Sequence, residues 1–259
     1  MGFLPNYNTA PSENVPRKHG VARLWELSTR DFWDNFRAGF LAILGCAPLI
    51  AGVWFAVDSH VLIFAPVIGL LGGMIAGPEL CGLADTILRG LRDEPGFWWH
   101  TYQRAWRRNA REALLPGAIT GALLATQVFL LLHAGAMRVS VGMGAALIAG
   151  ILVVLGVNLY IWPQMALLEL PFAALLKNAG ILFLGQLPRS LAALAIVAVY
   201  WGLIVRFFVL AVTILPLTNF WLPALPALFL IYPGIESNFQ IEQKLYGAEY
   251  GAEEVEKIN

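Results

Sequence analysis

The sequence predicts an all-α polytopic membrane protein with about six transmembrane helices and both termini in the cytosol. Of its 259 residues, 58% are hydrophobic and only 13% are charged, whereas about one-quarter of the residues of a soluble domain are charged. A helix needs roughly 20 apolar residues to cross a bilayer, and six uncharged stretches approach that length: residues 38–57, 61–78, 113–132, 139–168, 190–205 and 207–235. Arg206 and the break at residues 216–219 make the last two stretches the hardest to delimit, so five or seven spans remain open.

The positions of Lys and Arg predict the orientation of these spans. Basic residues gather before the first stretch, between the second and third, between the fourth and fifth, and after the sixth, while the alternate connections hold only Arg138 and Arg206. Because positive residues favour the cytosolic side, we expect residues 1–30 to be a flexible cytosolic tail, residues 31–241 the membrane domain and residues 242–259 a polar cytosolic tail. The formal net charge is zero, so no basic field favours nucleic acid as a partner.

Two polar connections are expected to form amphipathic cytosolic helices, termed here the first elbow (residues 79–111) and the second elbow (residues 169–189). In the first elbow, apolar residues recur at helical spacing from Leu80 to Leu91 with charged residues opposite them, and a second helix follows a break at Pro95. Aromatic residues on that second helix are expected to lie among lipid headgroups as membrane-interface anchors: Trp98, Trp99, Tyr102 and Trp106.

Four arginines on one helix face of the first elbow exceed what orientation alone requires. They form a candidate docking surface for a soluble partner with acidic side chains. The simpler alternative is an aromatic belt with arginines that only set orientation and contact membrane lipids. The predicted docking residues are Arg104, Arg107, Arg108, Arg111 and Lys177.

A threefold pattern of charges marks the cytosolic ends of the six stretches. An arginine precedes each odd-numbered span and a glutamate follows each even-numbered span, which predicts three helical hairpins. If the hairpins pack side by side, these charges form a cytosolic ring in which at least two arginine–glutamate pairs lie within about 4 Å. Chance charges at helix ends are the alternative. The predicted ring members are Arg37, Glu79, Arg111, Glu169, Arg189 and Glu236.

Polar residues inside the spans are few and neutral. Gln127, Asn158 and Gln164 are more typical of hydrogen bonds between helices than of a substrate path. Glycines such as Gly69, Gly73 and Gly77 favour close helix packing. The histidines lack metal-ligand spacing, and neither a nucleophile elbow nor a phosphate-binding loop is present in the sequence. We therefore expect no catalytic residues, no metal site and no cofactor.

Three segments, taken in order, resemble the YesL-like family of bacterial integral membrane proteins of unknown function. They are GPELCGLADTILRGLRDE, FWWHTYQRAWRRNAREALLPG and LPFAALLKNAGILFLGQLPRSLAAL, and the similarity extends over most of residues 32–241. The positions that match the family pattern are Gly77, Pro78, Arg89, Trp106, Asn109, Leu176, Lys177, Asn178, Pro188 and Arg189. The resemblance implies a bacterial cytoplasmic-membrane protein whose relatives are commonly found beside carbohydrate ABC transporters and sugar-degrading enzymes.

These observations leave three functional hypotheses. The first is a non-enzymatic accessory protein of carbohydrate uptake that docks an ABC transporter or its ATPase through the elbows. The second is a small channel or carrier that acts alone or as an oligomer. The third is an ABC permease subunit, suggested weakly by the order of Glu169, Ala173, Gly180 and Pro188 in the second elbow, which is loosely similar to a coupling segment.

Overall fold

The computed structural model describes residues 18–94 and 96–241 of the chain. These residues form nine helices and no strand, which confirms the predicted all-α class. Five of the helices, α2, α3, α4, α5 and α7, are long and apolar enough to cross a membrane, so the chain is a multi-pass membrane protein. The predicted tail segments 1–17 and 242–259 lie outside the described residues. The helices are α1 (Gly20–Arg30), α2 (Phe32–Asp58), α3 (Phe64–Arg92), α4 (Trp98–Leu132), α5 (Val141–Leu167), α6 (Phe172–Gly185), α7 (Leu187–Arg206), α8 (Phe208–Thr218) and α9 (Trp221–Phe239).

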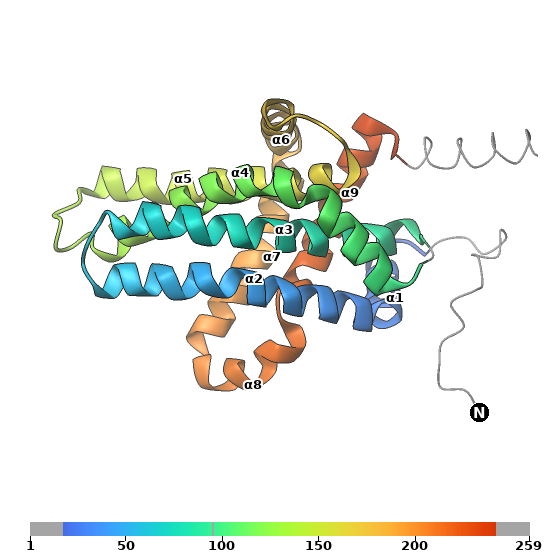
Figure 1. Cartoon of the computed structure of the whole chain (residues 1–259), viewed down its shortest axis with the longest axis horizontal. Helices are drawn as coiled ribbons and strands as arrows, with labels where there is room; N and C mark the ends of the chain where they lie inside the picture. The colour runs from blue at the N-terminus through green and yellow to red at the C-terminus, as the bar shows by residue number, and fades with distance from the viewer. Residues whose placement is uncertain (1–17, 95, 242–259) are drawn as a thin grey trace, which may run out of the picture.

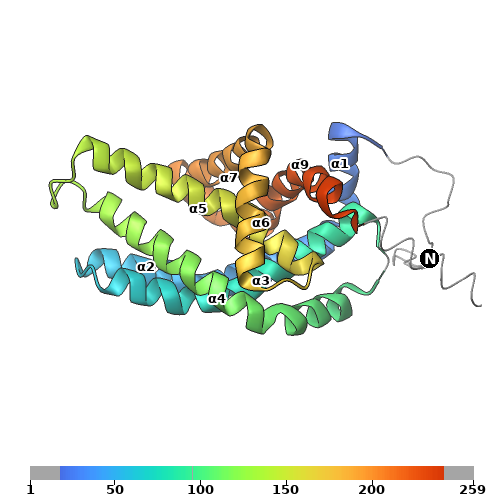
Figure 2. The same ribbon diagram turned by 90° about the horizontal axis from the view of Figure 1, so that it is seen from above.

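The four longest helices, α2 to α5, run along the long axis of the molecule (Figure 1). α3 packs between α2 and α4, and α4 in turn contacts α5. The connections between α2 and α3 and between α4 and α5 lie together at one end, where His60 Nδ1 and His133 Nε2 are 2.8 Å apart. α1 and the start of α4 lie at the opposite end (Figure 2). The first two predicted hairpins are therefore present and adjacent.

The predicted third hairpin is arranged differently. The chain breaks at Asn219, whose φ is 25°, so residues 207–235 form α8 and α9 in place of one expected span. α8 has 11 residues and rises only ~16 Å, which is too short to cross a bilayer. α6 and α7 cross the long helices (Figures 1 and 2). Asn219 Nδ2 donates to the carbonyl oxygen of Phe36 at 3.2 Å, so this turn lies beside the start of α2 and away from the end where an outer connection was expected.

Glycines bring the backbones of α3 and α4 into direct contact, as their pattern predicts. Gly69, Gly73 and Gly77 lie on one face of α3, opposite Gly117 and Gly121 of α4. A Cβ atom added at Gly73 would lie 2.1 Å from the carbonyl oxygen of Gly117, and one added at Gly117 would lie 2.3 Å from that of Gly73. Since real Cβ atoms do not come this close to a carbonyl oxygen, this interface requires residues without side chains.

The first elbow is not a separate pair of surface helices. α3 continues through Pro78 to Arg92, and α4 extends without interruption from Trp98 to Leu132. Proline removes a backbone donor and usually bends or ends a helix, but α3 is enclosed by α2 and α4, which hold its backbone in place. Asp85 and Arg92 are only 2% and 4% exposed. The face that was expected to be solvated is therefore an internal contact surface.

The second elbow contains one short helix, α6, and the beginning of α7. α6 has 14 residues and is apolar apart from Lys177 and Asn178. It contacts α5 and crosses it (Figure 2). The helix is thus present where it was expected, but it is less amphipathic than predicted.

Candidate functional site

Most of the described charged residues gather at the end of the molecule that holds α1, the last turns of α3 and the first part of α4. We call this region, residues 20–31, 79–94 and 96–112, the polar end. The opposite end consists of two short connections. The polar end contains basic residues from which the cytosolic side was predicted. It is therefore the candidate binding surface for a cytosolic partner.

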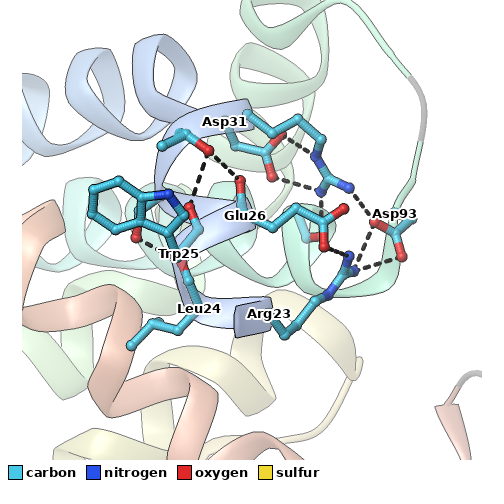
Figure 3. A network of polar contacts seen from close by, with 10 residues as sticks. Arg23, Leu24, Trp25, Glu26, Asp31 and Asp93 are labelled. Carbon is cyan, nitrogen blue, oxygen red and sulfur yellow. Dashed lines mark hydrogen bonds and ion pairs between the residues drawn. The ribbon is translucent and has the colours of Figure 1, made fainter. Parts of the chain in front are cut away.

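α1 is held to the end of α3 by an ionic contact that we call the α1 clasp (Figure 3). Arg23 Nη2 donates to both carboxylate oxygens of Asp93, at 2.8 and 2.6 Å. Arg30 contacts the same carboxylate and also donates to Asp31 and to the carbonyl oxygen of Gly90. Arg23 is only 7% exposed. Residues 20–30, expected to belong to a flexible tail, therefore form a docked helix.

The charges of the clasp shift the pKa values of their partners. Burial opposes ionisation of the Asp93 carboxyl, but the hydrogen bonds and positive charges of Arg23 and Arg30 outweigh burial and lower the pKa of Asp93 below its ordinary value. The hydrogen bond with Asp31 is the main cause that raises the pKa of Arg30. Both shifts favour the charged forms, so the clasp is an ion pair at neutral pH.

The arginines at the end of α3 are also neutralised within the molecule. Arg89 forms two ion pairs: its Nε lies 2.8 Å from Oδ2 of the buried Asp85, and its Nη1 lies 3.0 Å from Oε2 of Glu94. Arg92 Nε donates to the other oxygen of Glu94 at 2.6 Å. These residues were expected on a solvated face. The four-residue spacing of Asp85 and Arg89, which places two side chains on the same helix face, is the signal that could have indicated the pair.

The arginines of α4 differ from those of α1 and α3. Arg104, Arg107, Arg108 and Arg111 are all exposed, and none forms an ion pair with a carboxylate of the described residues. Arg104 Nη2 lies 3.1 Å from His100 Nε2, and Arg108 Nη2 donates to the carbonyl oxygen of Ala166 at 2.8 Å. All four are accessible on the surface, and their role in docking stays a prediction.

Lys177, the remaining predicted docking residue, lies on α6 and is also exposed. Among the described residues, no ion pair or hydrogen bond joins Lys177 to the α4 arginines. It therefore contributes a separate positive charge to the surface.

Glu79 binds two of the aromatic residues that were expected to be interface anchors. The Tyr102 hydroxyl donates to Glu79 Oε2 at 2.5 Å, and Trp106 Nε1 donates to Glu79 Oε1 at 3.0 Å. Tyr102 is 4% exposed. A carboxylate enclosed by helices needs hydrogen-bond donors, and this need turns the polar atoms of both rings inward. Tyr102 and Trp106 thus direct their polar atoms into the molecule, and their role as interface anchors stays a prediction.

The other two expected anchors differ from each other. Trp98 is half-buried, its ring centroid lies 5.3 Å from that of Tyr102, and its buried Nε1 has no hydrogen-bond partner among the described residues. Trp99 is 58% exposed. Of the four, Trp99 has the exposure that a membrane-interface anchor requires.

The predicted ring of arginine–glutamate pairs does not form among the described residues. Arg37 pairs with Asp34 at 3.9 Å and lies over the ring of Trp98. Glu79 is bound by aromatic donors, and Glu236 accepts from Tyr232 at 3.4 Å. The physical reason is that α7 crosses the long helices (Figure 1), so the third predicted hairpin does not stand beside the first two.

Two members of that set, Arg111 and Glu169, do line a common hollow of about 380 Å³. It lies between α4 and the chain that leads from α5 into α6. Glu112 and several apolar side chains complete its walls. The structure thus brings the end of the first elbow and the start of the second elbow together.

The polar residues inside the long helices pack against their neighbours. Thr120 Oγ1 donates to Asn158 Oδ1 at 3.0 Å, which links α4 to α5 as expected for such a residue. The Gln164 side chain is fully buried, and its Nε2 donates to the carbonyl oxygen of Tyr160 at 3.1 Å. Gln127 is half-buried on α4, and its amide nitrogen lies close to Gly150 of α5.

The five long apolar helices and the charged contacts of the polar end define the chain as a multi-pass helical membrane protein with a charged, compact polar end. Comparison of the chain with protein-family models, with curated proteins and with solved structures finds no match. The resemblance to the YesL-like family therefore stays a prediction that depends on the three sequence segments.

Proposed function

We propose that this protein is a non-enzymatic accessory protein of the bacterial cytoplasmic membrane that binds an acidic partner through the arginines of α4. The observation that supports the proposal is the difference between two groups of arginines at the polar end. Those of α1 and α3 are paired with internal carboxylates, whereas those of α4 are exposed and have no described carboxylate partner.

The α4 arginines lie close together on one helix, which is unfavourable without a counter-charge. Like charges three or four residues apart on a helix repel each other, and Arg104 is related to both Arg107 and Arg108 in this way. An acidic surface would relieve this repulsion and form bidentate hydrogen bonds with the guanidinium groups. The geometry therefore favours a partner that presents several carboxylates.

The identity of the partner is proposed from the family resemblance alone. A subunit or ATPase of a carbohydrate ABC transporter is the first partner to test, because relatives in that family are commonly found beside such transporters. The fold supports an accessory role over a carrier, since Asn158 and Gln164 are engaged in packing contacts.

The test is co-purification from native membranes after charge reversal. Arg104→Glu together with Arg107→Glu should abolish recovery of the partner, while Arg138→Glu, an exposed arginine at the opposite end, should leave it unchanged. Recovery of the same partner by both variants at equal expression would exclude the docking proposal. Solute flux in vesicles that contain this protein alone would favour the channel or carrier instead.

A further inference from the structure

The hollow between α4 and the start of α6 differs in composition from the rest of the polar end. Its walls combine three charged side chains, Arg111, Glu112 and Glu169, with apolar side chains that include Leu115 and Phe172. Its volume of about 380 Å³ lies within the range of small-ligand sites, about 300–1,000 Å³. A cavity of this kind suits a molecule with both charged and apolar parts.

The charges that line the hollow do not neutralise one another. One arginine and two glutamates line the same space, yet no ion pair within the described residues joins Arg111 to Glu112 or to Glu169. This contrasts with the arginines of α1 and α3, each of which has a carboxylate partner. The hollow therefore presents one site for an anion and two for a cation.

The depth of the hollow in the membrane is set by α4. From Arg111 to the last residue of that helix, Leu132, the helix rises ~32 Å, which is about the thickness of the hydrocarbon core. Arg111 thus lies where lipid headgroups begin if Leu132 is at the other boundary. Leu115, Ile119 and Leu123 follow Arg111 at intervals of about one turn along α4; all three are exposed and form an apolar track into the hydrocarbon region.

From these features we infer that the hollow is a binding site for a zwitterionic phospholipid with a primary ammonium group, as in phosphatidylethanolamine. The phosphate lies against the Arg111 guanidinium. The ammonium donates to the carboxylates of Glu112 and Glu169, and an acyl chain follows the track from Leu115. The inference shares Arg111 with the proposed docking surface but does not rest on that proposal, because a lipid in the hollow leaves Arg104, Arg107 and Arg108 exposed.

Three lipids that differ only in the headgroup test this inference. The full chain is purified and incubated with dioleoyl phosphatidylethanolamine, phosphatidylcholine or phosphatidylglycerol, and the retained lipid is counted by native mass spectrometry. Phosphatidylcholine has the same charges as phosphatidylethanolamine but no N–H donors. We expect about tenfold stronger retention of phosphatidylethanolamine, the effect of losing charge-assisted hydrogen bonds.

Matched variants assign the effect to the hollow. Glu112→Gln with Glu169→Gln should remove the preference for phosphatidylethanolamine over phosphatidylcholine. Arg111→Ala should lower retention of both lipids relative to Arg104→Ala, an exposed arginine of the same helix outside the hollow. The measurement on the wild-type chain can refute the inference by itself. Equal retention of phosphatidylethanolamine and phosphatidylcholine, or a preference for phosphatidylglycerol, would overturn it. An unchanged preference in the double variant would do the same.

Discussion

Substitution of Gly73 by alanine tests the backbone contact between α3 and α4. The added Cβ atom would lie 2.1 Å from the carbonyl oxygen of Gly117. Backbone atoms cannot turn aside as a flexible side chain can, so the two helices must separate locally by ~1.3 Å to restore a contact of about 3.4 Å. Gly69 and Gly77, one turn away on either side, would lose their close contacts with α4 at the same time.

The expected cost follows from two opposing contributions. Alanine is favoured over glycine within a helix by about 1 kcal/mol, whereas overpacking of a close contact costs about 1–3 kcal/mol and more where backbone must move. We therefore expect net destabilisation of about 2 kcal/mol, which corresponds to a fall in Tm of ~4–8 °C for a chain of this size. Gly202→Ala is the matched control, because nothing lies within 4 Å of a Cβ added there, and its Tm should rise slightly.

The two free cysteines provide the measurement. Cys46 and Cys81 are 5% and 1% exposed, so a maleimide dye that fluoresces on reaction with a thiol reports unfolding as the detergent-solubilised protein is heated. A Tm for Gly73→Ala equal to or above that of the wild type would refute the reasoning, since it would mean that α3 and α4 can separate without loss of stability.

Three further results are expected from the polar end. Asp93→Asn should speed hydrogen exchange of the α1 amides, since two guanidiniums lose their charged partner, whereas Asp58→Asn at the other end should not. Because the pKa of Asp93 is lowered in the folded chain, the clasp contributes stability above the ordinary aspartate pKa, near 4, and loses it as the pH falls through the lower folded value. Exchange of α1 in the wild type and the variant should converge as the Asp93 carboxyl is protonated, and a difference that does not shrink with falling pH would contradict this. Tyr102→Phe removes a donor to Glu79 and should lower Tm by several degrees, as expected for a hydrogen bond to a charged group, whereas Trp99→Phe should have little effect.

The sequence predicted those parts of the fold that depend on local composition. Apolar stretches of sufficient length became α2 to α5 and α7, and glycines at helical spacing marked the face of α3 that contacts α4. The continuity of α3 through Pro78 could not be foreseen, because enclosure by neighbouring helices overrides the local effect of proline. The path of α7 to α9 was missed because the hydrogen bond from Asn219 to Phe36 joins residues that are 183 positions apart.

The candidate site was predicted only in part, because the sequence shows local spacing but not contacts between residues far apart in the chain. The exposure of the α4 arginines follows from helical spacing, which the sequence shows directly. The partners of Glu79 lie 23 and 27 residues away along the chain, so helix periodicity could not indicate that Tyr102 and Trp106 turn toward it. Likewise, no local sequence pattern indicated that Arg111 and Glu169 line the same hollow.

The length of α4 has a mechanical consequence. The helix has 35 residues and an axial length of ~52 Å, about 20 Å more than the hydrocarbon thickness; it contains Pro116 and bends along its length (Figure 2), and Arg104 lies roughly 25 Å along it from the membrane midplane. Helices change tilt when bilayer thickness changes, and a rotation of ~10° about the midplane would displace Arg104 sideways by ~4 Å, close to the 5.4 Å pitch of a helix. A helix of this length acts as a lever, through which lipid composition would shift the position of whatever is bound at its far end.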